Sequence, residues 1–207
     1  MTAPHVPECL FVAGPNGGGK STVYERLLET GMFPVERLYI NTDDIRRNIA
    51  RQYGYASDIG AARISIDMVR SAIAERRDFV FETTLSSKHS VRSIEIARKS
   101  GFRIGLIFVV LQTAQLHIAR IRTRVAQGGH SIPDADVFRR YRTSLTNFAR
   151  ILGHIDQGLV VDNSPPDSPR QLIKIVSGRL SRLEDFDPHL KFDADLWGYL
   201  ADNEPPW

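Results

Sequence analysis

The chain has 207 residues, of which 42% are hydrophobic and 25% charged, and its formal net charge is +3 at pH 7. This length supports one hydrophobic core and not two, and the composition excludes a disordered or fibrous chain. We therefore expect one domain over residues 1–183 and a short tail over 184–207. The small positive excess permits an anionic ligand, and it does not require a nucleic acid partner.

The sequence predicts a cytoplasmic protein without a membrane partner. Cys9 is the single cysteine, so no disulfide can form within the chain, as is usual in a reducing compartment. The first residues lack the basic and apolar regions of a secretory signal. The longest apolar stretch, Ile104–Leu111, is too short to cross a bilayer.

Strands and helices are predicted to alternate along the chain. Five short apolar runs bounded by turn or polar residues predict buried strands at Cys9–Ala13, Leu38–Ile40, Phe79–Phe81, Ile104–Leu111 and Leu159–Val161. Helical spacing predicts helices at Lys20–Glu29, Asp43–Gln52, Ala61–Arg76, His89–Lys99, Ala114–Ala126, Val137–Leu152 and Pro169–Leu183. This alternation favours a mainly parallel sheet with helices on both faces, and its binding crevice should lie at the carboxyl ends of the strands.

A glycine-rich segment follows the first predicted strand. It reads Gly14-Pro15-Asn16-Gly17-Gly18-Gly19-Lys20-Ser21-Thr22 and matches G-x-x-x-x-G-K-[ST]. Glycines let backbone N–H groups turn toward a phosphate, and the following helix N-terminus favours an anion. Lys20 would reach the β- and γ-phosphates, and Ser21 would ligate Mg²⁺.

The segment predicts ATP and Mg²⁺ binding in a P-loop NTPase-type three-layer α/β sandwich, with a five-stranded sheet in the order 2-3-1-4-5. The alternative is a glycine-rich turn with a surface lysine.

Carboxylates follow the second and third predicted strands. Asp43 lies in Asn41-Thr42-Asp43-Asp44, where it can accept the proton of an attacking hydroxyl, although helix capping also explains an aspartate there.

Glu82 and Thr84 follow the third strand and suit a hydroxylated substrate. Alternatively, Glu82 takes the Mg²⁺- or water-orienting position of many P-loop ATPases, or the segment is a plain loop. The chain has no N-K-x-D motif, which argues against a typical GTPase.

Two arginine-rich helices with a glycine-containing connection predict a helical lid over residues 114–152. The arginines are Arg120, Arg122, Arg124, Arg139, Arg140 and Arg142. Arginines brought in by closure neutralise the charge that develops in phosphoryl transfer. A solvated basic face or a nucleic-acid patch is the alternative. Asn163 follows the last predicted strand, where the loop either lies near the adenine or is a simple turn.

Six segments in this order resemble the zeta-toxin family of P-loop kinases: AGPNGGGKST, NTDDIRR, FVFETTLS, RVAQGGHSIP, RRYRTSLTNF and VDNS. The resemblance implies a kinase that phosphorylates the sugar 3′-hydroxyl of UDP-N-acetylglucosamine, acting as a toxin with a small antitoxin partner. It implies that Lys20 and Ser21 hold ATP-Mg²⁺, that Asp43 is the catalytic base and that Glu82 and Thr84 contact the amino-sugar. The lid arginines it implies are Arg124 and Arg140. Ser86 and His130 depart from the family pattern, which has arginines near these positions.

Alternative hypotheses for the same residues keep the ATP site but assign it another acceptor or a role other than catalysis. The acceptor is then a nucleoside, a dinucleotide or a polynucleotide 5′-hydroxyl. In a further reading the chain is a non-catalytic ATP-binding switch, in which Asp43 and Glu82 are dispensable.

Overall fold

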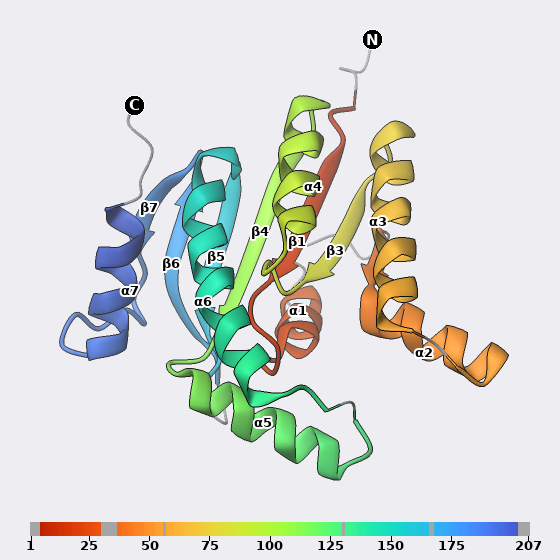
Figure 1. Cartoon of the computed structure of the whole chain (residues 1–207). Coiled ribbons are helices and arrows are strands. Elements are labelled where there is room, and N and C mark those ends of the chain that lie inside the picture. The colour runs from red at the N-terminus through yellow and green to blue at the C-terminus, as the bar shows by residue number, and fades with distance from the viewer. Residues whose placement is uncertain (1–4, 30–36, 56, 130, 166–167, 203–207) are drawn as a thin grey trace.

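The described residues form one seven-stranded sheet with helices packed on it (Figure 1). The computed structural model describes residues 5–29, 37–55, 57–129, 131–165 and 168–202. The strands are β1 (Glu8–Ala13), β2 (Leu38–Asn41), β3 (Phe79–Thr83), β4 (Arg103–Val110), β5 (Gln157–Asp162), β6 (Arg170–Val176) and β7 (Arg179–Arg182). The helices are α1 (Lys20–Glu29), α2 (Thr42–Tyr53), α3 (Asp58–Ala74), α4 (Lys88–Lys99), α5 (Ala114–Ala126), α6 (Asp134–Ile151) and α7 (Lys191–Ala201).

The first five strands pair in parallel in the predicted order β2-β3-β1-β4-β5. Parallel neighbours need a crossover connection, and helices α1 to α6 provide these crossovers. The carboxyl ends of all five strands therefore meet at one edge of the sheet. This edge lies above α5 in Figure 1. It carries the loops after β1, β2, β3 and β5, where the sequence predicted the site residues.

The prediction of five strands is wrong, because two antiparallel strands, β6 and β7, extend the sheet beyond β5. They occupy Pro169–Leu183, where a helix was predicted. Ile173, Lys174, Ile175 and Val176 alternate between buried and exposed, which is the period of a strand. Ser177 and Gly178 have φ values of 50° and 76°, as the tight two-residue turn of a hairpin requires.

Alternation along the strands divides the apolar side chains into two layers. Phe11 of β1 and its neighbours on that face pack with α3, α4, α6 and α7. Val12 faces the other way, toward Val23 and Leu27 of α1. Helices thus cover both faces of the sheet, as expected of a three-layer α/β sandwich. In the part of the chain that is described, no helix is long and apolar enough to span a membrane.

The segment after residue 183 packs on the same core as the preceding domain. Phe186, Leu196 and Leu200 belong to the larger apolar cluster. The Arg182 guanidinium lies 5.0 Å from the Phe186 ring centre and 4.4 Å from that of Trp197, so cation–π contacts also hold α7. Trp207, which was grouped with this tail, lies outside the described residues.

Candidate functional site

The loop between β1 and α1 forms a close-fitting cradle, here called the phosphate cradle (Gly14–Thr22). Gly14 has φ 137°, and a Cβ at this position would lie 1.9 Å from the Val109 carbonyl oxygen. Gly19 has φ 82°, and a Cβ there would lie 2.4 Å from Asn163 Nδ2. Both positions therefore require glycine, for conformation and for space. Such a turn before a helix N-terminus suits an anion.

Lys20 is the buried cation of the phosphate cradle. Its side chain is 8% exposed, and Nζ donates a hydrogen bond to the Pro15 carbonyl oxygen at 3.3 Å. Burial lowers the pKa of Lys20, while the nearby carboxylates of Glu82 and Asp43 act in the opposite direction. Lys20 thus lies close to the carboxylates of Glu82 and Asp43.

Three side chains from distant parts of the chain hold the cradle. Asn163 Nδ2 donates to the Gly18 carbonyl oxygen at 2.8 Å, and Arg140 of α6 donates to Asn16 Oδ1 at 3.0 Å. The third is His117 of α5, whose Nδ1 lies 2.7 Å from the Asn16 carbonyl oxygen. The cradle is therefore braced by the loop after β5 and by both helices of the predicted lid.

His117 is buried and acts as a neutral side chain. Its Nε2 accepts a hydrogen bond from the Leu111 N–H at 3.1 Å, so Nδ1 carries the proton and donates to Asn16. Burial lowers the pKa of His117 to about 4, and the cations of Lys20 and Arg120 add to this effect. The imidazole therefore joins the end of β4 to the cradle across the physiological pH range.

Glu82, at the end of β3, faces the hydroxyl of Ser21. Ser21 Oγ donates to Glu82 Oε2 at 2.8 Å, and the Tyr39 hydroxyl donates to the same oxygen at 2.6 Å. Burial and the adjacent Glu82 raise the pKa of Tyr39, so it remains a donor. A hydroxyl beside a carboxylate at the phosphate end of a P-loop suits Mg²⁺, which prefers hard oxygen ligands. The residues present thus fit the predicted Mg²⁺, for which Ser21 would be a ligand and Glu82 the partner of that hydroxyl.

Asp43 is not needed to cap the helix on which it lies. The Asn41 side chain caps α2 by accepting from the backbone N–H of Asp43 at 2.9 Å and of Asp44 at 3.4 Å. Asp44 pairs with Arg47 on the helix surface. Asp43 is exposed and lines the cavity that Lys20 also lines. The two aspartates therefore differ in environment, since Asp43 lines the cavity and Asp44 does not.

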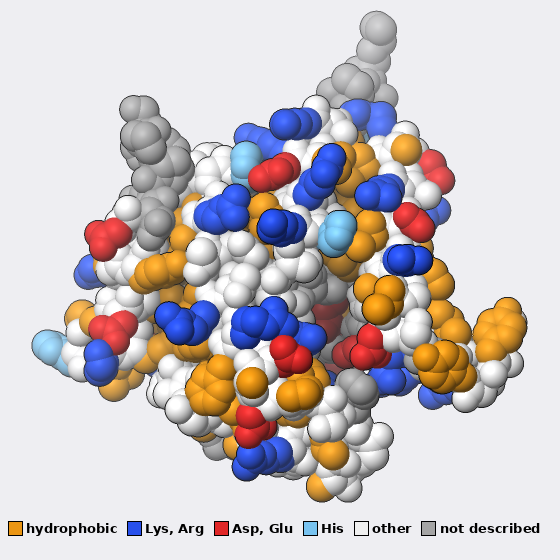
Figure 2. Space-filling view, viewed as in Figure 1, with side chains coloured by type: hydrophobic (Ala, Val, Ile, Leu, Met, Phe, Trp, Pro, Cys, Tyr) orange, Lys and Arg blue, Asp and Glu red, His pale blue; other side chains and the backbone are white. Residues whose placement is uncertain are grey.

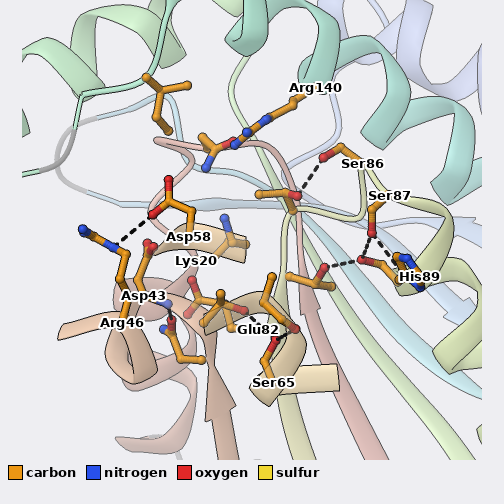
Figure 3. A pocket seen from close by; sticks show the side chains of 18 of the residues that line it. Lys20, Asp43, Arg46, Asp58, Ser65, Glu82, Ser86, Ser87, His89 and Arg140 are labelled. Atoms are coloured by element: carbon orange, nitrogen blue, oxygen red, sulfur yellow. Dashed lines mark hydrogen bonds and ion pairs between the residues drawn. The ribbon is translucent and has the colours of Figure 1, made fainter. Parts of the chain in front are cut away.

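A cavity of about 530 Å³ opens between the cradle, α2, α3, α4 and the start of α6. Figure 2 shows it as a hollow with acidic side chains inside and basic side chains around it. In Figure 3, Lys20, Asp43 and Arg140 point toward the same space. The cavity brings together seven of the predicted site residues, namely Asn16, Lys20, Asp43, Glu82, Thr84, Arg124 and Arg140. The other predicted site residues do not line it, namely Gly14, Pro15, Gly17, Gly18, Gly19, Ser21, Thr22 and Asn163; Thr22 is exposed on α1.

A row of hydroxyl side chains forms one side of this cavity, here called the hydroxyl wall (Thr83, Thr84, Ser86, Ser87 and Ser90). Its members bond to one another: Thr84 with Ser86 at 2.8 Å, Thr83 with Ser90 at 2.8 Å and Ser87 with Ser90 at 2.9 Å. The turn between them carries buried Leu85 with φ 53°. Asn147 of α6 fixes this turn by donating to the Leu85 carbonyl oxygen at 2.9 Å.

The arginines of the predicted lid divide into separate groups. Arg124, Arg139 and Arg140 line the cavity. Arg120 instead donates to the Asn163 carbonyl oxygen at 2.6 Å, and Arg122 pairs with Asp134 at 2.7 Å away from the cavity. The second half of α6 belongs to the core through Phe148, whereas α5 lies away from the sheet (Figure 1). His130 lies outside the described residues.

Several lining or supporting residues were not predicted from the sequence. Arg46 Nε pairs with Asp58 Oδ1 at 3.6 Å, and both residues line the cavity, as does His89, which lies beside Ser87 (Figure 3). Arg46 had a signal, because it follows Asp43 by three residues and so lies on the same side of α2. Asp58 and His89 had none, since their closeness depends on how α3 and α4 pack.

The chain is similar in sequence to one protein family and to one curated protein. The sequence model of the family described as Zeta toxin matches residues 1–164. An uncharacterized protein of Haemophilus influenzae is 31% identical over 134 residues, which is 65% of this chain and 92% of that protein.

Two solved structures share the fold at low sequence identity. The AvrRxo1-ORF1:-ORF2 structure with ATP has a TM-score of 0.63 at 13% identity, over 98% of this chain and 66% of that one, so this chain spans just under two thirds of its length. The PezAT chromosomal toxin-antitoxin system of Streptococcus pneumoniae has a TM-score of 0.59 at 14% identity, over 95% and 87%. Because the family match covers most of the chain and includes the cradle, Asp43, Glu82 and the predicted lid, this chain belongs to the zeta toxin family.

Proposed function

We propose that the protein is a kinase that transfers the γ-phosphate of ATP to a hydroxyl group of a nucleotide sugar. One observation carries the proposal: Lys20 of the phosphate cradle and the exposed carboxylate of Asp43 line the same cavity. A cradle for the donor and a base for the acceptor are the two parts that phosphoryl transfer needs.

The donor side is supported by the fit of the cradle. Gly14 and Gly19 allow the backbone to approach a phosphate, and Lys20 supplies the cation. Ser21 would ligate Mg²⁺, and Glu82 would orient Ser21 and the water around the metal. Bound Mg²⁺ would neutralise charge on the phosphate oxygens. ATP is also the nucleotide named for one structure of the same fold.

On the acceptor side, Asp43 would hold the acceptor hydroxyl and accept its proton. The acceptor oxygen bonds to the γ-phosphorus as the bond from that phosphorus to the bridging oxygen breaks, and ADP leaves. Lys20, Arg124 and Arg140 would stabilise the negative charge on the transferring group, because their side chains line the cavity around it.

The chemistry of the cavity supports a nucleotide sugar, with UDP-N-acetylglucosamine as the first choice. The hydroxyl wall and Thr42 offer donors and acceptors to a polyhydroxylated ring. Arg46 and Arg139 line the same cavity and can pair with a diphosphate. Membership of the zeta toxin family and the fold shared with a toxin-antitoxin system support a further role as a toxin with a small antitoxin partner.

Two matched variants test the proposal. Asp43→Asn should lower the turnover of UDP-N-acetylglucosamine by about 10²–10⁴-fold, the contribution of a general base, with ATP binding unchanged. Asp44→Asn, one residue away on the same helix, should keep wild-type turnover. The assay is acceptor-dependent ADP release with a panel of nucleotide sugars. ATP binding without turnover of any sugar would refute the nucleotide-sugar acceptor, and equal rates in Asp43→Asn and wild type would refute Asp43 as the base; both results together would favour a nucleotide-dependent switch.

A further inference from the structure

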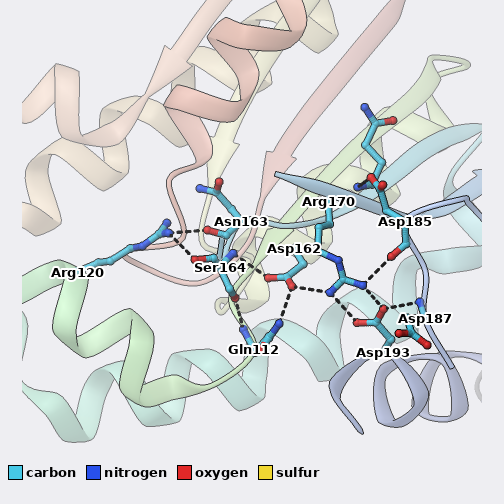
Figure 4. Close-up of polar contacts among 10 residues, drawn as sticks. Gln112, Arg120, Asp162, Asn163, Ser164, Arg170, Asp185, Asp187 and Asp193 are labelled. Atoms are coloured by element: carbon cyan, nitrogen blue, oxygen red, sulfur yellow. Dashed lines mark hydrogen bonds and ion pairs between the residues drawn. The ribbon is translucent and has the colours of Figure 1, made fainter. Parts of the chain in front are cut away.

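A buried group of charges connects the C-terminal segment to the end of β5 (Figure 4). Arg170, at the start of β6, donates to Asp162 of β5 at 3.2 Å and contacts both carboxylate oxygens of Asp193 in α7. It also donates to the Asp185 carbonyl oxygen at 2.6 Å. Asp162 and Asp193 are fully buried, at 0% exposure, so each carboxylate depends on these partners.

The charge of Arg170 is secure in this setting. Burial alone would lower its pKa, but the carboxylates of Asp193 and Asp162 outweigh burial and raise the pKa above its ordinary value. Arg170 therefore remains a cation that joins two carboxylates from different elements. A single side chain thus ties β5, β6 and α7 together.

Asp162 also bonds to the loop that follows it. Its Oδ1 accepts from the Ser164 N–H at 2.8 Å, and its Oδ2 accepts from Gln112 Nε2 at 3.0 Å. The bond between Asp162 and Ser164 sets the turn at Asn163, because it joins the residues on either side of it. The Asn163 N–H also donates to the Val110 carbonyl oxygen at 2.9 Å.

Asn163 in turn touches the phosphate cradle and the lid. Its side chain donates to Gly18, and its own carbonyl oxygen accepts from Arg120 of α5 at 2.6 Å. At Gly19 there is no room for a Cβ beside Asn163, so the two segments are in direct contact. Hydrogen bonds therefore join α7 to Arg170 and Arg170 to Asp162, and the peptide bond from Asp162 leads to Asn163, whose side chain bonds to the cradle.

The family match ends at residue 164, and Arg170, Asp185 and Asp193 all lie beyond it. The residues that support the loop thus lie outside the part of the chain that the family model matches. Nothing in the proposed reaction uses these residues directly, because none of them lines the cavity.

We propose that Arg170 is a positioning residue for ATP: through Asp162 it holds Asn163 and Ser164 against the phosphate cradle and α5. This inference rests on the proposed function, since it assumes that ATP binds at the cradle. It makes the C-terminal segment part of the nucleotide site. Removing the connection should weaken ATP binding and leave the transfer step itself intact.

Arg170→Met and Arg182→Met form a matched pair for the test. Both arginines attach the C-terminal segment, but Arg182 does so through the rings of Phe186 and Trp197, away from Asp162. Arg170→Met should raise the KM and Kd for ATP about tenfold, the size expected from losing a charge-assisted contact, with kcat at saturating ATP within about twofold of wild type. Arg170→Lys should recover part of the affinity. Arg182→Met should lower Tm and leave the Kd for ATP unchanged.

The outcomes separate the inference from the proposed function. Wild-type protein that binds no ATP would refute the proposed site itself. Folded Arg170→Met that binds ATP like wild type, or Arg182→Met that loses the same affinity, would refute the positioning role. If Arg170→Met does not fold, Asp193→Asn provides the measurement, because it keeps Arg170 and weakens its anchor. A smaller loss of ATP affinity is expected there, and wild-type affinity would contradict the inference.

Discussion

The phosphate cradle and the hydroxyl wall belong to one cavity, yet they are held in place by different kinds of contacts. Side chains far away in the sequence fix the cradle, namely Asn163, His117 and Arg140. The side chains of the hydroxyl wall bond mainly to near neighbours, such as Thr84 with Ser86. Its tie to a distant element is the hydrogen bond from Asn147 to the Leu85 carbonyl oxygen.

This difference separates two tasks of the site. Every acceptor would need the same phosphate geometry, and the cradle is built into the sheet and its helices. Acceptor choice depends on side chains that can change with little effect on the core. We therefore expect substitutions at the cradle to affect folding or ATP binding, and substitutions at the hydroxyl wall to affect acceptor binding.

The largest effect is expected from breaking the cradle at Gly14. Gly14→Ala would place a Cβ 1.9 Å from the Val109 carbonyl oxygen at a φ of 137°, so β4 would have to move. The free energy of unfolding should fall by about 4 kcal/mol, as strain and overpacking add. Gly54→Ala is the control, since it has φ 74° and nothing within 4 Å, and it should cost only about 1 kcal/mol. Urea denaturation measures both, and equal losses would contradict the argument.

The next effect is a pH dependence that comes from His117. Burial lowers the pKa of His117 from 6.5 to about 4, so the unfolded chain binds a proton that the folded chain excludes. The stability from the neutral imidazole is complete above pH 6.5 and is lost as the pH falls toward 4, by up to about 3 kcal/mol. In His117→Asn this part of the pH dependence should disappear. Denaturation curves at pH 7, 5.5 and 4 provide the check, and parallel losses in both proteins would exclude His117 as the cause.

The smallest effect is expected at the anchor of the hydroxyl wall. Asn147→Ala removes the hydrogen bond to Leu85 and should lower the free energy of unfolding by about 1–2 kcal/mol. The KM for the acceptor should rise while the KM for ATP stays constant, because the cradle has its own anchors. Steady-state kinetics with each substrate varied measures this. A matching rise in the KM for ATP would show that the two sides are not independent.

Much of the fold could be predicted because its strands are buried on both faces and read as apolar runs. Helices Lys20–Glu29 and Ala114–Ala126 were predicted with their observed bounds. The hairpin of β6 and β7 was missed because a bulge near Val161 lets the adjacent residues Leu172 and Ile173 both face inward, which hides the period of two. The turn at Ser177-Gly178 was the signal that should have identified it.

The candidate site was predictable where a residue directly follows a strand and not where helices meet. Lys20, Asp43 and Glu82 could be expected to lie close together because parallel strands end at one edge of the sheet, and all three line the cavity. The partner of Glu82 could not be read from the sequence, since Ser21 lies 61 residues away and their contact depends on the order of the strands. The contact between Arg170 and Asp162 could not be predicted either, because it depends on the position of β6 in the hairpin that was missed.

The hairpin also decides what the sheet presents to other molecules. The two border strands, β2 and β7, are both four residues long, and β7 begins and ends with arginine. Short, charged borders discourage strand-to-strand association between molecules. A chain cut after residue 164 would instead leave the open side of β5, with Val160 and Val161, available for pairing. We therefore expect such a truncated protein to aggregate, even though it keeps every residue of the family match.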